Sequence, residues 1–191
     1  LSAYEDNELE TYLKPYIESR SGITYILGLN EPDLSSQANA TIDQAVKALK
    51  NLKTYLENNN LRHKVKIGSP VVSNDYDNWL IPYFNKLVDE NLIDEIDFIV
   101  MHKYHIGPKE NNNSNIRLTK PCIFFNNLKE RALSLRTVAG DKPVWLKEFS
   151  VKLNNEDDLD LITYNEDDVE NFMLNIIKYM DKSNIFTRYA W

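Results

Sequence analysis

Short apolar runs alternate with helix-like segments along the whole chain, and this alternation limits the fold more than any other feature. The apolar runs predict buried strands at 23–29, 65–70, 96–102, 143–149 and 186–191. Apolar residues at helical spacing predict helices at 4–19, 41–58, 76–91, 121–138 and 166–182. Strands that alternate with helices of this length indicate parallel βα units joined by right-handed crossovers.

The expected architecture is α/β, a (β/α)₈ TIM-type barrel of which this chain covers roughly the C-terminal five βα units. A full barrel needs about 250 residues, whereas this chain has 191. Five strands leave two open edges, so we expect a segment before Leu1 or a partner chain to complete the barrel. An open doubly wound sheet is the alternative.

The alternation continues on both sides of two polar stretches, 109–116 and 154–168, which we expect to be surface loops. Residues 1–191 are therefore expected to form a single domain, incomplete at its N-terminus. The sequence does not fix the cellular location of the protein, and a secreted, cell-wall or particle-associated location is compatible with it.

Composition narrows the kinds of ligand. The net charge is −7, from 22 basic and 29 acidic residues, which argues against nucleic acid because such binding depends on clustered Lys and Arg. No apolar run approaches the roughly 18 residues that span a bilayer, so no membrane partner is expected. His63, His102 and His105 lack zinc-site spacing, although a site of His102 and His105 with an acid stays open as an alternative. No Gly-rich phosphate loop is present, and neither a metal nor a cofactor is expected.

Two of the predicted strands end in a glutamate. Glu31 follows the run 26–30, and Glu148 lies near the end of the run 143–149. In a barrel of parallel strands, the carboxyl ends of the strands meet at the mouth where chemistry occurs. A single glutamate in this position is as readily a solvated loop residue, but the shared setting of the two favours paired carboxylates.

Paired carboxylates are the usual machinery of glycoside hydrolysis. One carboxyl donates a proton to the leaving oxygen, and the other acts as an ionised group at the sugar. A separation of about 5–5.5 Å would give the retaining mechanism, with a covalent glycosyl-enzyme intermediate. Glu31 is then the predicted acid/base and Glu148 the predicted nucleophile.

Other strand ends carry side chains suited to a sugar. His102 and Tyr104 share a strand face, so Tyr104 is expected to hydrogen-bond the nucleophile and His102 to orient it or a sugar hydroxyl. Asn30 offers an amide to the sugar 2-hydroxyl, and Trp191 an indole face for stacking. Packing roles remain open for His102 and Trp191, and we assign Trp79 and Trp145 to helix or core positions.

With these residues assembled, the chain resembles the Asl1-like glycosyl hydrolases, a catalytic-core family classed as glycoside hydrolase family 128. The matching motifs follow the family's order over nearly the whole chain: residues 28–33, 68–70, 97–104, 143–149 and 188–191. The resemblance implies a (β/α)₈-type barrel that hydrolyses β-1,3-glucans in an endo fashion. It also implies that Glu31 matches the acid/base and Glu148 the nucleophile.

Two features depart from the family pattern. Lys147 stands where the family usually has a small hydroxyl residue, although strand alternation is expected to turn it away from Glu148. The N-terminal portion, which in the family supplies part of the glucan groove, is not in this sequence.

The leading prediction is a retaining endo-β-1,3-glucanase that binds a polysaccharide substrate, β-glucan, and needs no cofactor. Two alternatives stay open. The first is a non-catalytic glycan-binding or structural protein that keeps the barrel as part of a larger assembly. The second is a retaining glycosidase that acts on another β-linked glycan.

Overall fold

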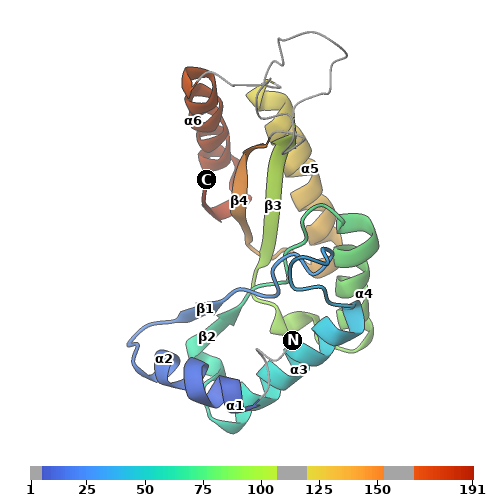
Figure 1. Cartoon of the computed structure of the whole chain (residues 1–191), viewed down its shortest axis with the longest axis vertical. Helices are drawn as coiled ribbons and strands as arrows, with labels where there is room; N and C mark the ends of the chain where they lie inside the picture. The colour runs from blue at the N-terminus through green and yellow to red at the C-terminus, as the bar shows by residue number, and fades with distance from the viewer. Residues whose placement is uncertain (1–5, 107–119, 153–165) are drawn as a thin grey trace. The chain divides into compact units, whose positions relative to one another are not determined.

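A computed structural model describes residues 6–106, 120–152 and 166–191 (Figure 1). The chain divides into two compact units, and each is described by itself. The first unit consists of Leu1–Val100 and Leu135–Lys142, and the second of Met101–Ser134 and Pro143–Trp191. The predicted loop 109–116 and most of the predicted loop 154–168 lie outside the described residues.

The first unit contains a parallel strand pair. Strand β1 (Thr24–Ile26) pairs with β2 (Val65–Ile67), with Thr24 opposite Val65 and Ile26 opposite Ile67. An isolated parallel bridge between Asn30 and Val71 continues this pairing beyond the strands, and another pairs Gly68, just after β2, with Phe98. The regular strands are thus shorter than predicted, but the chain keeps its strand-like course up to Asn30.

Helical segments precede, separate and follow these two strands along the chain. The described helical segments of the first unit are α1 (Asp6–Glu8), η2 (Leu9–Leu13), α2 (Lys14–Glu18), α3 (Ile42–Asn58), η3 (Arg62–Lys64), η4 (Tyr76–Leu80), α4 (Ile81–Asp89) and η5 (Ile93–Glu95). The predicted opening helix is therefore interrupted by a π-helical turn just before Pro15. The helix predicted at 76–91 likewise begins with a π-helical turn, η4.

Helix α3 begins at a complete capping box. The Thr41 hydroxyl accepts a hydrogen bond from the Gln44 amide, and the Gln44 side chain accepts one from the Thr41 backbone. These bonds satisfy two donors that the first turn of a helix leaves unpaired. The helix ends at Asn58, with Asn59 as its C-cap and Asn60 in the left-handed conformation, as the Asn-rich stretch predicted. An ion pair joins Lys86 of α4 to Asp43 of α3, and Lys50 of α3 pairs at 2.5 Å with Glu90, the C-cap of α4.

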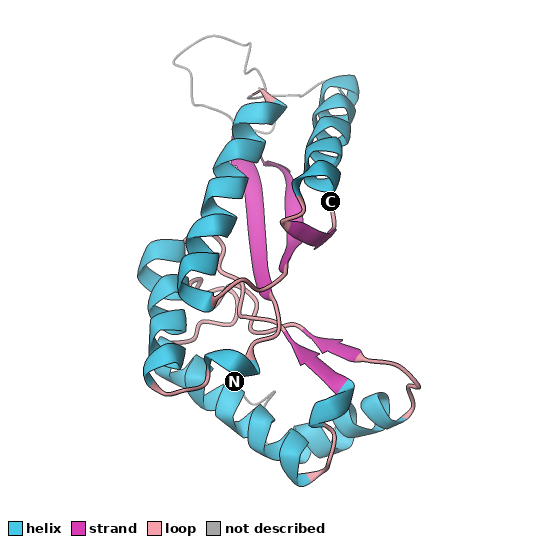
Figure 2. Cartoon of the chain, turned by 180° about the vertical axis from the view of Figure 1, so that it is seen from behind, coloured by secondary structure: helices cyan, strands magenta, loops and turns pink. Residues whose placement is uncertain are grey.

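The second unit contains a three-stranded sheet with the order β3-β4-β5, except for the first two residues of β3, Ile99 and Val100, which belong to the first unit. Its strands are β3 (Ile99–Ile106), β4 (Val144–Lys152) and β5 (Phe186–Tyr189). Strands β4 and β5 are parallel, with a register shift between Val144 and Trp145. The helices are α5 (Pro121–Ala139) and α6 (Glu166–Ser183), drawn in cyan beside the sheet in Figure 2.

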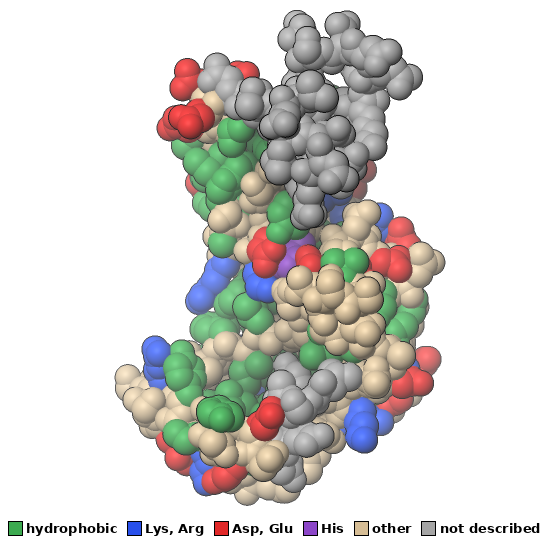
Figure 3. Space-filling view, viewed as in Figure 1, with side chains coloured by type: hydrophobic (Ala, Val, Ile, Leu, Met, Phe, Trp, Pro, Cys, Tyr) green, Lys and Arg blue, Asp and Glu red, His purple; other side chains and the backbone are tan. Residues whose placement is uncertain are grey.

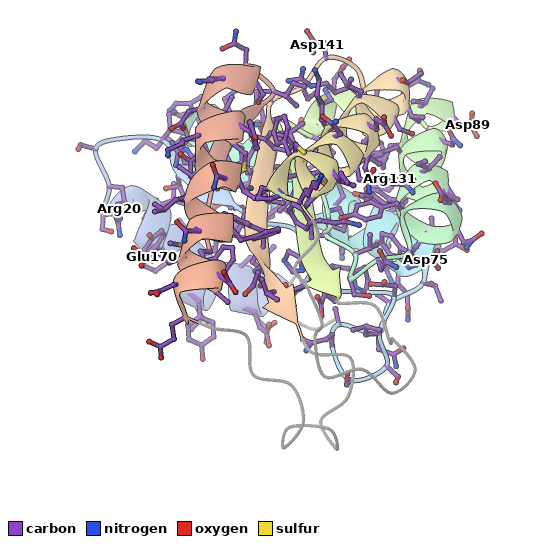
Figure 4. All side chains as sticks on the ribbon, turned by 90° about the horizontal axis from the view of Figure 1, so that it is seen from above. Arg20, Asp75, Asp89, Arg131, Asp141 and Glu170 are labelled. Carbon is purple, nitrogen blue, oxygen red and sulfur yellow. The ribbon has the colours of Figure 1, made fainter. Side chains whose placement is uncertain are left out.

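Aromatic rings join the helices of this unit to its sheet. Phe124 of α5 meets Phe172 of α6 edge-on, with ring centroids 5.3 Å apart. The ring centroids of Phe125 of α5 and Phe186 of β5 are 6.3 Å apart. The first turn of α6 carries the acids Glu166, Asp167 and Asp168. Figure 3 shows acidic side chains at this end of α6 and hydrophobic ones below them, and Leu174 and Tyr179 of the same helix are 41% and 37% exposed. Glu170 also points outward from α6 (Figure 4).

The α/β class and the parallel pairing of strands are confirmed. The described residues form two open sheets, and no closed barrel is seen among them. The (β/α)₈ closure and the single domain over 1–191 stay predictions. Among the described helices, none is both long enough and apolar enough to cross a membrane.

Candidate active site

Strand β4 presents Glu148 beside two rings of its neighbour β3. The Tyr104 hydroxyl donates a short hydrogen bond to Oε2 of Glu148. His102 Nε2 lies 3.3 Å from Oε1 of the same carboxylate. His102 is completely buried, whereas the side chain of Glu148 is 40% exposed. The sheet therefore anchors one side of the carboxylate and leaves the other side accessible to a ligand.

The rings of His102 and Tyr104 share a strand face because the two residues are two positions apart. They meet nearly at right angles, with an interplanar angle of 76°. Because His102 is packed and Tyr104 is bonded at its tip, both rings are held in place. The second unit thus brings together Glu148, Tyr104 and His102, three of the residues chosen from the sequence.

The environment of Glu148 favours the ionised carboxylate. Burial raises the pKa of Glu148, but the hydrogen bond from Tyr104 and the charges of His102 and Lys147 outweigh it, so the pKa falls below its usual value. A carboxylate that stays ionised at acid pH suits a nucleophile better than a proton donor.

Lys147 does not turn away from Glu148, and the expectation from strand alternation was wrong. Its Nζ lies 3.4 Å from Oε1 of Glu148. Alternation fixes only the direction of the Cβ atom, whereas the four-carbon stem of lysine can carry its ammonium group around the strand.

The three tryptophans of the chain differ in their exposure and contacts. Trp191 is 45% exposed and meets Phe149 edge-on, with ring centroids 5.0 Å apart. Its partly open indole leaves the predicted sugar-stacking role available. Trp145 is half-buried rather than in the core, and the Arg188 guanidinium lies 4.4 Å from its ring centroid. Trp79, in the first unit, is buried as predicted.

Glu31 and Asn30 lie in the first unit, where the chain leaves the course of β1. The Glu31 amide donates to the Val71 carbonyl at 2.7 Å. Glu31 has a φ of 43°, in the left-handed region that is uncommon for residues other than glycine. Such backbone strain persists only where the surroundings enforce it, and it is frequent at functional sites. The amide of Asn30 contacts the Gln37 side-chain oxygen at a long 3.4 Å.

Asp33 fixes the turn that follows Glu31, a role that the sequence analysis missed. Its carboxylate accepts hydrogen bonds from the Ser73 amide at 2.9 Å and the Ser73 hydroxyl at 2.7 Å. It also accepts longer bonds from the amides of Asn74 and Asp75. Burial raises the pKa of Asp33, but these bonds outweigh it and hold the pKa below its usual value. The bonds tie the turn after β1 to the loop after β2.

Gly28 permits the close approach of these two loops. A Cβ atom at this position would lie 2.5 Å from the Pro70 nitrogen and 2.6 Å from the Ser69 carbonyl carbon and oxygen. These are backbone atoms, which cannot rotate away as a side chain can. A glycine is therefore required two residues before Asn30.

The structure thus describes the surroundings of Glu148 and of Glu31 separately, each within its own unit. In the second unit it assembles Glu148 with Tyr104, His102 and Lys147, and in the first unit it holds Glu31 and Asn30 at a rigid turn. Whether the two glutamates share a site, and whether Asn30 or Trp191 contacts a sugar, stay predictions. The expected absence of a metal and a cofactor also stays a prediction.

Solved structures with the same fold are β-1,3-glucanases of family 128. The chain resembles a subgroup I endo-β-1,3-glucanase from Amycolatopsis mediterranei in complex with laminaripentaose, at 18% identity and a TM-score of 0.67, covering 100% of this chain and 67% of that chain. It resembles a subgroup II endo-β-1,3-glucanase from Pseudomonas viridiflava at 21% identity and a TM-score of 0.64, covering 98% of this chain and 63% of that chain. It also resembles a subgroup V exo-β-1,3-glucanase from Cryptococcus neoformans at 17% identity and a TM-score of 0.63, covering 98% of this chain and 61% of that chain.

At these identities the likeness establishes a shared fold. No curated protein matches the sequence. The family model described as glycosyl hydrolase catalytic core matches residues 3–191, nearly the whole chain. This match confirms the resemblance that the motifs around Glu31 and Glu148 predicted. The chain therefore belongs to the glycosyl hydrolase catalytic core family and is a glycoside hydrolase.

Proposed function

We propose that this chain is the catalytic core of a retaining endo-β-1,3-glucanase, with Glu148 as nucleophile and Glu31 as acid/base. The observation that carries the proposal is the setting of Glu148. The side chain of Glu148 is 40% exposed, and its carboxylate accepts a hydrogen bond from Tyr104. Oε1 of the carboxylate lies 3.3 Å from His102 Nε2. The lowered pKa of Glu148 keeps it ionised, which is the state that attacks a sugar carbon.

The mechanism has two steps. In the first, Glu31 donates a proton to the glycosidic oxygen while Glu148 attacks the anomeric carbon, and a glycosyl ester forms on Glu148. In the second, Glu31 takes a proton from water, the water oxygen bonds to the anomeric carbon, and the ester bond breaks with its electron pair returning to Glu148. Two inversions at one carbon retain the β configuration.

Substrate choice comes by analogy with the neighbours, among which the Amycolatopsis enzyme was crystallised with laminaripentaose. A neutral glucan also agrees with a chain of net charge −7 that offers little to a polyanion. Within the described part of the second unit, Trp191 is the exposed indole at the strand ends. We assign it to stacking on a glucose ring, and Asn30 to the sugar 2-hydroxyl.

A complete barrel would need strands beyond those of this chain. Strand β1 lies at the edge of its sheet in the described residues. Tyr25 and Leu27 on and after this strand are 42% and 38% exposed. We propose that strands from a segment before Leu1 or from a partner chain pair with this edge, and that the whole protein forms the glucan groove.

The test is reducing-end release from laminarin by the native protein, beside Glu31→Gln and Glu148→Gln. The native protein is expected to release reducing ends, with the first product in the β configuration by proton NMR, and each substitution to reduce release by at least about 1,000-fold. Release of α product would contradict the retaining mechanism. Laminarin binding without hydrolysis would favour a binding role, and activity on a β-1,4-glucan or β-1,4-mannan instead would change the substrate.

Laminarihexaose separates endo from exo action, since both kinds occur among the structural neighbours. An endo-acting enzyme is expected to produce internal fragments of several lengths from the first minutes of reaction. Release of glucose alone from one chain end would contradict the endo assignment.

A further inference from the structure

The ammonium group of Lys147 is the least expected member of the site around Glu148. Its Nζ lies 3.4 Å from Oε1, the carboxylate oxygen that His102 also approaches, whereas Tyr104 bonds Oε2. Lys147 is adjacent to Glu148 in β4, so the same strand carries the carboxylate and a cation directed to it. The side chain of Lys147 is 28% exposed, so water only partly screens the contact.

Opposite charges at this distance stabilise the ionised carboxylate relative to a neutral ester. The carboxylate of Glu148 is neutralised when the glycosyl ester forms and becomes an anion again when the ester is hydrolysed. A cation beside it therefore assists the second step, in which the carboxylate leaves. The same cation weakens Glu148 as a nucleophile in the first step, since it stabilises the charge that is consumed.

We propose that Lys147 is a positioning residue for Glu148, whose ammonium group makes the carboxylate a better leaving group in hydrolysis of the glycosyl-enzyme. This inference rests on the proposed retaining function. Bonds and charges balance without a further reactant: water supplies the oxygen that bonds to the anomeric carbon, Glu31 takes the proton, and Glu148 keeps the electron pair of the broken ester bond.

The titratable groups of the second unit that face Glu148 are His102 and Tyr104 from β3 and Lys147 from β4. Tyr104 and His102 act on the carboxylate in the same direction as Lys147. A test of Lys147 must therefore leave both rings in place. Lys147→Met removes the charge and keeps the length of the side chain, and Lys147→Arg restores the charge.

An aryl β-laminaribioside with a good leaving group makes the second step rate-limiting, so kcat reports ester hydrolysis and kcat/KM reports ester formation. For Lys147→Met we expect kcat to fall by about twofold to fivefold, the range of a partly exposed ion pair. We expect kcat/KM at neutral pH to be unchanged or raised, and the acid limb of its pH profile to move to higher pH. Lys147→Arg should restore both, and Lys178→Met, on the exposed face of α6, should change neither.

A direct titration separates this inference from the proposed function. Carboxyl-carbon NMR of glutamate-labelled protein, with the Glu148 signal assigned by its loss in Glu148→Gln, should show a higher pKa for Glu148 in Lys147→Met than in the native protein. If native protein hydrolyses no glycoside, the proposed function fails while the titration still decides whether Lys147 acts on Glu148. An unchanged Glu148 titration, or a fall in kcat/KM as large as the fall in kcat, would overturn the inference.

Discussion

Glu148 shows how neighbouring groups set the protonation state of a carboxylate. Burial alone would raise its pKa and favour a proton donor, but Tyr104, His102 and Lys147 reverse that effect. Among the groups that lower the pKa of Glu148, the hydrogen bond from the Tyr104 hydroxyl has the largest effect. The ionised state of Glu148 therefore depends most directly on this bond.

Tyr104→Phe should remove that bond and keep the ring. Since a hydrogen bond to a charged group contributes roughly 1.5–3 kcal/mol, and the Glu148 carboxylate is the leaving group when the glycosyl-enzyme is hydrolysed, we expect kcat for an aryl β-laminaribioside to fall by roughly 10-fold to 100-fold. The bond favours the ionised form, so its loss should raise the pKa of Glu148 and move the acid limb of the pH profile upward. Tyr189→Phe is the control, because Tyr189 bonds the exposed Asp181 instead. An acid limb that stays in place would contradict this account.

Asp33 stabilises the turn after Glu31 in a pH-dependent way. Its pKa is lowered in the folded chain, so its contribution is present above the pKa of the unfolded state and is lost as the pH falls through the folded-state pKa. Asp33→Asn should lower the free energy of unfolding by about 1–2 kcal/mol at neutral pH, and by less at strongly acid pH. Urea unfolding at both pH values measures this difference.

The control for that measurement is Asp89→Asn, at an exposed position near the end of α4 (Figure 4). It makes the same chemical change in the same unit without touching the turn. A difference between Asp33→Asn and native protein that stays constant with pH would contradict the role assigned to the Asp33 carboxylate.

At the scale of elements, sequence periodicity predicted the helices closely because each carries its own end signals. Thr41 and the Asn-rich stretch at 58–60 bound α3, and the acids at 166–168 begin α6. Those acids had also been included in a predicted loop, but their charges favour a helix N-terminus. Strand ends were less predictable because they depend on partners far along the chain: β3 begins at Ile99 and runs to Ile106, beyond the apolar run.

The candidate site shows the same division. The hydrogen bond from Tyr104 to Glu148 could be predicted, because strand ends and two-residue alternation are local patterns, whereas the catalytic roles of these residues stay predictions. Asp33 could not be assigned, because its partner Ser73 is 40 residues away. Lys147 was misplaced because alternation says nothing about the path of a long side chain.

The capping box of α3 is testable by itself. Thr41→Ala should lower the free energy of unfolding by about 1 kcal/mol, because it leaves the Gln44 amide without its hydroxyl partner. Thr54→Ala, at an exposed position inside the same helix, should be neutral or stabilising, since alanine has the higher helix propensity. Equal losses in the two variants would contradict the capping role.

Gly28 links an element to the site. Gly28→Ala would bring a Cβ atom within 2.5–2.6 Å of the backbone at Ser69 and Pro70, so one of the two segments must move. We expect a loss of about 1–3 kcal/mol in unfolding free energy and reduced activity, because Asn30 and Glu31 follow directly. Gly22→Ala, with no atom within 4 Å of the added carbon, is the control. Full activity in Gly28→Ala would show that the turn tolerates displacement.

For the whole molecule, the net charge bears on the class of ligand that is expected to bind. The chain has a net charge of −7 and belongs to a glycoside hydrolase family, so a neutral polysaccharide is the expected substrate. Binding of a neutral glucan by stacking and hydrogen bonds should depend little on salt. We expect KM for laminarin to change by less than about twofold when NaCl is raised at constant pH. A steep loss of affinity with salt would instead indicate a charged ligand.

In the proposed mechanism, Glu148 forms a covalent bond to the anomeric carbon of the substrate. An activated 2-deoxy-2-fluoro-β-laminaribioside forms the glycosyl ester but hydrolyses it slowly, so the intermediate accumulates on a retaining enzyme. Mass spectrometry of the treated native protein, followed by peptide mapping, is predicted to show a single added disaccharide on Glu148 and none on Glu148→Gln. An adduct on another residue, or no adduct on protein that hydrolyses laminarin, would contradict the account.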